Sequence, residues 1–278
     1  EVTPGIKPFY DRFEGREGYE DDVFITSEEA MKIPGENTVA IVVDVNDPYR
    51  VECPDLLDKE AISIVVFDHH RVCERQISNA DLSYVDTFAS STCEMVTELV
   101  QYIEDDVRIN KLTAEGLLAG ISLDTKNFAF KTGVRTFEAA SYLKKSGADT
   151  IEVKKLFNSD IKDFITKAEI IQNAKVINNN ICLAYTKTET DNINIVIAQA
   201  ADELLNIKEV EASFVLARKD DRVFISARSL GNINVHVLME NLGGGGHRDM
   251  AGAQLDTSLE KAYEMVKDTI QTYIKEEE

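Results

Sequence analysis

The stretch Ala61-Ile62-Ser63-Ile64-Val65-Val66-Phe67-Asp68-His69-His70 decides the fold of the first half of this chain. Its apolar part, residues 61–67, is rich in β-branched side chains and too short for an independent helix, so it predicts a strand. A second run of the same kind covers residues 38–43. Because both runs are continuously hydrophobic rather than alternating, we expect them to be central strands of a parallel sheet.

Helical patterns lie after these strands, at residues 91–102 and 113–123. We expect Thr113 to cap the second helix, with Glu115 in its first turn. Strands that alternate with helices predict a doubly wound, parallel-sheet α/β domain over residues 1–150.

The second half of the chain has a different pattern. Residues 136–174 read as helices broken near Gly147, and we expect residues 151–175 to form a helical linker. Residues 176–278 then form a smaller mixed α/β domain. Its expected strands are residues 180–185, 212–218 and 222–228, of which the last two form a hairpin, and the end at residues 276–278 reads as a solvated tail.

The composition limits the partners of this chain. Thirty basic and fifty acidic residues give a net charge of −20, which disfavours duplex nucleic acid unless ions or local basic groups compensate. The four cysteines are far apart and form no C-x-x-C pair, so we expect reduced thiols in a cytosolic protein. No apolar run approaches the roughly 18–20 residues that span a bilayer, so this segment is expected to make no membrane contact.

Polar groups that follow apolar segments form the first candidate site. Asp44 follows one strand and Asp68-His69-His70 the next, and ligands of open α/β sheets bind at these carboxyl ends. Asp124 also follows an apolar segment and is expected at the same edge. Carboxylates with imidazole suit Mn²⁺ or Fe²⁺, and two such ions would polarise a phosphoryl group and generate hydroxide near neutral pH. Taken singly, each acid could be a helix cap and each histidine a buried hydrogen-bonding group.

Four consecutive glycines form the second candidate site, immediately before His247 and after an expected helix at residues 235–242. Such a run predicts positive φ angles or a close approach of a ligand, and its exposed N–H groups could bind an anion. An ordinary flexible loop is the alternative. Arg228, near the end of an expected strand, favours phosphate recognition. The run comprises Gly243, Gly244, Gly245 and Gly246.

Several motifs together resemble the DHH phosphoesterases that carry a DHH-associated C-terminal domain. The resemblance covers about residues 38–255 and is closest to the catalytic part of membrane-anchored cyclic di-AMP phosphodiesterases of the PAS–GGDEF–DHH type. The motifs that carry it, in order, are Val66-Phe67-Asp68-His69-His70-Arg71, Phe88-Ala89-Ser90-Ser91-Thr92, Gly120-Ile121-Ser122-Leu123-Asp124-Thr125, Arg135-Thr136-Phe137-Glu138-Ala139-Ala140, Ile225-Ser226-Ala227-Arg228-Ser229-Leu230-Gly231 and Gly243 to His247.

The resemblance implies roles for individual residues. Asp44 would bridge two Mn²⁺ ions, one of which His69 and Asp124 would complete, while Asp68 and His70 would support catalysis. The second domain would bind the substrate. Its binding residues would be Arg228, Gly243, Gly244, Gly245, Gly246, His247 and Asn234, and Ser91 of the first domain would join them.

One family motif, a histidine followed by a Pro-Asp-x-Asp string, does not precede Asp44. Residues 1–22 resemble the segment just downstream of that motif. We therefore expect weak binding of Mn²⁺, with one or no ion, for the chain taken as complete. The parent protein is expected on the cytoplasmic side, membrane-anchored through an upstream segment, and a homodimer is left open.

The function implied is hydrolysis of cyclic di-AMP to pApA. Hydrolysis of short oligonucleotides such as pApA, or of pyrophosphate, is an alternative because the metal chemistry is shared. An alternative of another class is a cyclic-dinucleotide-binding module with impaired catalysis.

Overall fold

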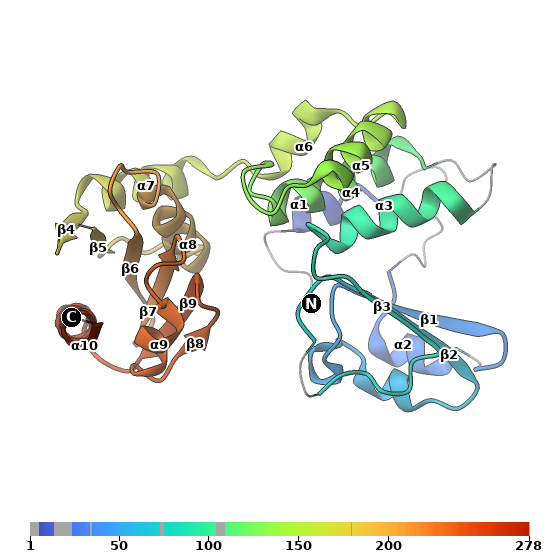
Figure 1. The fold of residues 1–278 in the computed structure, drawn as a ribbon, viewed down its shortest axis with the longest axis horizontal. Coiled ribbons are helices and arrows are strands. Elements are labelled where there is room, and N and C mark those ends of the chain that lie inside the picture. Colours follow the sequence, from blue (N-terminus) through green and yellow to red (C-terminus); the bar gives the residue numbers. More distant parts are fainter. Residues whose placement is uncertain are drawn as a thin grey trace. The chain divides into compact units, whose positions relative to one another are not determined.

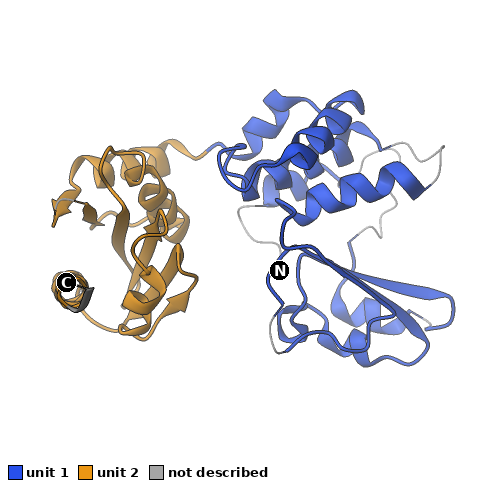
Figure 2. Cartoon of the chain, in the orientation of Figure 1, with its two compact units in different colours: residues 1–158 blue, residues 159–278 orange. Residues whose placement is uncertain are grey.

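The computed structural model describes residues 6–13, 24–33, 35–72, 75–103, 109–178 and 180–277. The chain divides into two compact units, residues 1–158 and residues 159–278 (Figure 2). Most of the segment 1–22 that resembles the family lies outside the described residues, as does the final residue of the expected tail.

In the described part of unit 1, the sheet has three strands, β1 (Thr38–Val43), β2 (Ile62–Asp68) and β3 (Leu82–Val85). All pairings are parallel and the order is β1-β2-β3 (Figure 1). The two strands expected from the sequence are confirmed, and β3 is an addition. Of the two, only β2 is central among the described strands, because β1 lies at an edge.

The two faces of this sheet differ. Val42, Ile64 and Val66 point to a buried core that also contains Leu57 and Ile77. The other face is apolar yet exposed, and its exposed side chains are Val39, Ile41, Val43, Leu82 and Tyr84. Although β1 is hydrophobic almost throughout, only one of its two faces therefore packs into a buried core.

Among the described residues of unit 1, four further helices pack against one another around a core of their own (Figure 1): α3 (Thr92–Ile103), α4 (Lys111–Asp124), α5 (Val134–Lys145) and α6 (Thr150–Leu156). Gly120 permits α3 and α4 to approach closely, since a Cβ there would lie 2.2 Å from the Cys93 sulfur. The expected helix cap was wrong by one turn. Asn110, not Thr113, is the N-cap of α4, and its side chain accepts a hydrogen bond from the Thr113 N–H.

The position of Asp124 also differs from the expectation. It is the last residue of helix α4, not a residue at a strand end, and Thr125 follows it as the C-cap. The apolar segment before it has helical burial, with Leu118 and Ile121 buried against α5 and α6.

The remaining elements of unit 1 are short. Helix α1 packs on α4, where the Phe9 ring occupies the space beside Gly116 and Arg12 pairs with the buried Glu115. Helix α2 has a capping box between Thr26 and Glu29. These elements are α1 (Lys7–Tyr10), α2 (Ser27–Lys32), and the 3₁₀ helices η1 (Pro48–Arg50) and η2 (Pro54–Asp58).

Unit 2 is built on a six-stranded mixed sheet in the order β4-β5-β6-β7-β9-β8. The expected hairpin is confirmed, since β6 and β7 pair antiparallel across Asp220 and Asp221. The strands are β4 (Lys175–Ile177), β5 (Ile181–Thr186), β6 (Ala212–Lys219), β7 (Arg222–Ser229), β8 (Gly245–Gly246) and β9 (Met250–Leu255).

Helices cover both faces of this sheet. Helices α7 (Ile161–Gln172) and α8 (Ile193–Leu204) pack on one face, and α9 (Val235–Glu240) and α10 (Leu259–Glu277) pack on the other. The linker expected over residues 151–175 thus contains α6, which lies in unit 1, and α7, which lies in unit 2. Among the described residues, no helix is long and apolar enough to cross a membrane.

Candidate active site

Asp44 stands at the carboxyl end of β1 in a left-handed conformation, with φ at 64°. Aspartate adopts this conformation more readily than most residues, although it remains uncommon. The Asp44 N–H still donates to the Phe67 carbonyl at 2.9 Å, so the ladder with β2 continues through the turn. The carboxylate is 57% exposed and lies beside the next strand end, where its Oδ1 is 3.5 Å from the Nε2 of His69.

Asp68 is fully buried at the end of β2 and accepts hydrogen bonds from four donors. Its Oδ1 accepts from the N–H groups of His69 and His70, at 2.8 and 3.2 Å, and from His70 Nδ1 at 2.7 Å. Its Oδ2 accepts from the side-chain amide of Asn46. His70 Nδ1 also lies 4.0 Å from Asp44, but the shorter contact defines its partner. Asp68 therefore orients His70 and leaves Nε2 of that ring free.

His69 lies between two carboxylates. Its Nε2 is 3.5 Å from Asp44 Oδ1 and 3.8 Å from Asp124 Oδ2, and its side chain is only 8% exposed. Its other nitrogen, Nδ1, is buried and makes no hydrogen bond to a described residue. The pKa of Asp124 is raised above its ordinary value, mainly because the carboxyl group is buried. The nearby His69 acts to lower this pKa, and the charge of Asp44 acts to raise it.

The first turn of helix α3 lies beside Asp44. The Ser91 hydroxyl is buried and accepts from the Glu94 N–H at 3.0 Å, so this residue caps the helix. The Thr92 hydroxyl donates to Asp44 Oδ1 at 2.9 Å. Sequence reasoning named Ser91 as a site residue and missed both Thr92 and Asn46, although Thr92 stands in a motif that carried the resemblance.

The residues present fit a divalent cation. Asp44, His69 and His70 each offer one ligand atom within 4.8 Å of the others. Asp124 adds a second carboxylate beside His69. Among the described residues, no lysine or arginine forms an ion pair with Asp44 or Asp124. Two carboxylates that share a partly buried site repel each other unless a cation lies between them. Mixed oxygen and nitrogen donors suit ions such as Mn²⁺.

In unit 2, the four glycines connect α9 to β9 and do not form a uniform loop. Gly243 and Gly246 have φ angles of 76° and 147°, which confirms the expected positive φ for these two. A Cβ at Gly244 would lie 2.1 Å from the Gly252 carbonyl oxygen, whereas a Cβ at Gly245 would meet no atom within 4 Å. Gly245 and Gly246 form the short strand β8, paired with β9.

The other expected binding residues of unit 2 have different environments. Arg228 is 8% exposed, and its Nε donates to Asp202 Oδ1 of α8 at 3.2 Å. His247 is exposed in the turn between β8 and β9. The Asn234 side-chain oxygen is buried without a described hydrogen-bond partner, although its backbone N–H donates to the Tyr273 hydroxyl.

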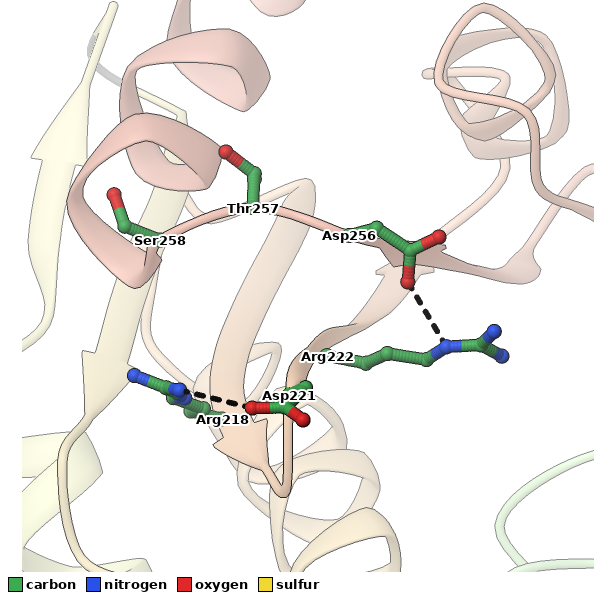
Figure 3. Close-up of a pocket in the computed structure, with 6 residues that line it drawn as sticks. All are labelled: Arg218, Asp221, Arg222, Asp256, Thr257 and Ser258. Carbon is green, nitrogen blue, oxygen red and sulfur yellow. Dashed lines mark ion pairs between the residues drawn. The ribbon is translucent and has the colours of Figure 1, made fainter.

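A groove of about 460 Å³ borders this loop and is lined by Gly243, Gly244 and polar groups that include Asn194, Ser226 and Gln254. A second groove lies at the opposite end of β7 from Arg228. There Arg218 pairs with Asp221 and Arg222 with Asp256, at 3.6 and 2.9 Å (Figure 3). Arg228 is likewise paired with an aspartate, Asp202, so ion pairing does not rank the two grooves as anion sites.

The fold and the acid–imidazole cluster define a two-domain α/β protein with a candidate site for a divalent cation at parallel strand ends. Residues 6–121 match the DHH family, N-terminal domain, and residues 178–276 match the DHHA1 domain. The chain belongs to the DHH family, as its sequence motifs indicated.

Three known proteins illustrate the relationship. The chain is 44% identical over 256 residues to "Cyclic-di-AMP phosphodiesterase GdpP" of Bacillus subtilis (strain 168), covering 91% of this chain and 39% of that protein. It is 40% identical over 255 residues to "Cyclic-di-AMP phosphodiesterase PdeA" of Listeria monocytogenes, with the same two coverages. An exopolyphosphatase-related protein from Bacteroides fragilis has a similar fold, with a TM-score of 0.78 and 21% identity, over 89% of this chain and 74% of that one. The chain thus spans about two fifths of the length of these two phosphodiesterases.

Proposed function

We propose that this chain is the hydrolytic part of a phosphodiesterase that converts cyclic di-AMP to pApA with Mn²⁺ as cofactor. The cluster of Asp44, His69 and His70 at the strand ends carries the proposal, because it combines the donors of a divalent-cation site with an oriented imidazole. The similarity to two cyclic-di-AMP phosphodiesterases supports the choice of substrate.

In unit 1, Asp44, His69 and Asp124 would hold the metal. Bound Mn²⁺ would polarise the phosphoryl oxygens and lower the pKa of an attacking water. His70 has its Nδ1 held by Asp68, so its Nε2 is the atom that can exchange a proton with the substrate or contact its phosphate. Asp68 would keep the His70 ring in one orientation and tautomer, as carboxylates do in other acid–base pairs.

In unit 2, the guanidinium of Arg228 and the open space beside Gly245 would receive phosphate oxygens. The N–H groups of Gly243, Gly244 and His247 already donate to backbone carbonyls, so they do not form the anion-binding turn expected from the sequence. Arg228 is already oriented by Asp202, which reduces the entropy lost on binding. His247 and the unpartnered Asn234 oxygen would add polar contacts. The groove beside Gly243 and Gly244 has the size and the amide groups to accept a nucleobase.

The test is release of pApA from cyclic di-AMP, measured with and without added Mn²⁺. It should be made on the 278-residue chain and on the longest natural polypeptide that contains it, with Asp68→Ala as the inactive variant. We expect Mn²⁺-dependent release that the variant lacks. Absence of metal-dependent release from both polypeptides would refute the proposal. Tight binding of cyclic di-AMP without turnover would instead identify a nucleotide-binding module.

A second candidate is hydrolysis of short oligonucleotides such as pApA. The chain is 28% identical over 250 residues to "Bifunctional oligoribonuclease and PAP phosphatase NrnA" of Bacillus subtilis (strain 168), covering 87% of this chain and 77% of that protein. Comparing turnover of cyclic di-AMP, pApA and pyrophosphate at equal concentration would distinguish these substrates.

A further inference from the structure

Helix α3 begins beside the candidate metal site, and its first residue contacts that site directly. The Thr92 hydroxyl donates to Asp44 Oδ1 at 2.9 Å, and Thr92 is only 4% exposed. Because Ser91 is the N-cap, Thr92 is the first helical residue, where the partial positive charge of the helix also favours a carboxylate.

Asp44 is more exposed than the other acids of the site. Its carboxylate is 57% exposed and lies 3.5 Å from His69 Nε2 and 4.0 Å from His70 Nδ1. Its left-handed backbone turns the side chain away from the strand direction. Among the described residues, the hydrogen bond that this carboxylate accepts comes from the Thr92 hydroxyl.

The start of α3 is itself held firmly. Glu94 is buried, and its carboxylate accepts from the Ser90 hydroxyl at 2.6 Å. Arg135 of α5 then donates to Glu98 of α3 and to Asp86, which follows β3, each at 2.7 Å. The helix is thereby fixed to the strand edge, and a hydroxyl on its first residue has a defined position.

We propose that Thr92 is a positioning residue, whose hydroxyl holds one oxygen of Asp44 so that the remaining lone pairs of the carboxylate face the metal. The inference rests on the proposed metal site and names a group that sets its geometry without contacting the ion. Outer-shell partners of metal ligands change metal affinity by roughly 10- to 100-fold when removed.

The test is titration of the metal-free chain with Mn²⁺, in which the electron paramagnetic resonance signal of free Mn²⁺ reports binding without substrate or turnover. We expect Thr92→Val to weaken binding by about 10- to 100-fold, and Thr92→Ser, which keeps the hydroxyl, to remain within about 3-fold of the unaltered chain. Thr97→Val is the matched control. Thr97 is a buried threonine on the same helix whose hydroxyl donates to the Cys93 carbonyl, so its loss should leave affinity unchanged.

A second pair of variants covers the case in which Thr92→Val fails to fold. Thr92→Ser and Thr92→Ala both lack the methyl group and differ in the hydroxyl, so only Thr92→Ala should bind Mn²⁺ weakly. Equal affinities of the serine and alanine variants, or unaltered affinity of Thr92→Val, would overturn the inference. Asp44→Asn separates it from the proposed function. The metal site itself is wrong if that variant keeps full Mn²⁺ affinity, or if neither the 278-residue chain nor the longest natural polypeptide that contains it binds Mn²⁺.

Discussion

Two adjacent glycines in unit 2 should respond oppositely to the same substitution. An alanine at Gly244 would place its Cβ 2.1 Å from the Gly252 carbonyl oxygen and 2.6–2.7 Å from atoms of Ala253. An alanine at Gly245 would place its Cβ where no atom lies within 4 Å, and Gly245 has no positive φ. The sequence offers no reason to separate these positions, whereas the structure does.

The magnitudes follow from these contacts. Real Cβ contacts essentially never fall below 3.0 Å, and both neighbours of Gly244 belong to the paired strand β9, so the backbone must shift. Overpacking of this kind costs about 1–3 kcal/mol. Replacing glycine by alanine where the backbone is compatible stabilises by about 0.4–1 kcal/mol, because the unfolded chain loses freedom. We therefore expect Gly244→Ala to destabilise unit 2 and Gly245→Ala to be neutral or slightly stabilising.

Urea denaturation followed by circular dichroism measures the free energy of unfolding of both variants. Because the chain has two units, hydrogen exchange of the amides of β9 provides the local readout. Faster exchange should appear in Gly244→Ala alone. The reasoning would be refuted if both variants had the stability of the unaltered chain, or if Gly245→Ala were the less stable one.

The same two alanine variants can also distinguish a structural role of the glycine from a role in ligand binding. If Gly245 is a glycine because a phosphate approaches its backbone, its alanine variant should bind cyclic di-AMP at least about 10-fold more weakly while remaining fully folded. Equilibrium binding of the nucleotide to the folded variant measures this effect. Unchanged affinity would mean that the open space beside Gly245 does not receive the ligand.

Three further predictions concern unit 1. Asp68→Asn should lower the free energy of unfolding in urea by about 2–4 kcal/mol, since an amide must point its NH₂ group at one of four donors and charge-assisted bonds are lost. Arg135→Gln should cost about 1 kcal/mol at pH 7. Arg135 holds the pKa of Asp86 below its usual value. The stabilisation by this ion pair is therefore complete above the pKa that Asp86 has in the unfolded chain, and it is lost as the pH falls through the lower pKa of the folded state. In acid denaturation, the difference in free energy of unfolding between Arg135→Gln and the unaltered chain should shrink below about pH 4. Burial raises the pKa of Cys93 to about 12, and at pH 8 iodoacetamide should label this thiol only in urea, as read by peptide mass spectrometry.

The elements that the sequence predicted are those with strong local patterns. Strand β2 is apolar almost throughout, and the β6–β7 hairpin consists of two mainly apolar runs around a polar turn, so both are readable from composition. Strand β9 contains Gly252 and two alanines, and β8 consists of two glycines. Their strand conformation comes from pairing with β7 and with each other, which no local pattern records.

The candidate site likewise contains residues that the sequence predicted and residues that it missed. Asp44, His69 and His70 were predicted to lie together because each follows an apolar strand, and their ligand atoms are close. Asn46 and Thr92 were missed because their partners lie 22 and 48 residues away in the sequence. Asp124 was placed correctly beside His69 for an incorrect reason, since an apolar run before an acid does not distinguish a strand end from a helix end.

Parallel pairing is what brings these residues into chemical contact. In the register of β1 and β2, Val43 lies opposite Phe67, so the next residues, Asp44 and Asp68, lie at the same edge of the sheet. A slip of one residue would exchange the faces of β2 and expose the buried Asp68, with its four donors, on the opposite side. The hydrophobic contacts of Ile64 and Val66 with the core exclude that slip. The packing that stabilises the sheet therefore also fixes the distances at the candidate site, which is why a metal-binding measurement on Thr92 and Asp44 variants tests the fold and the chemistry together.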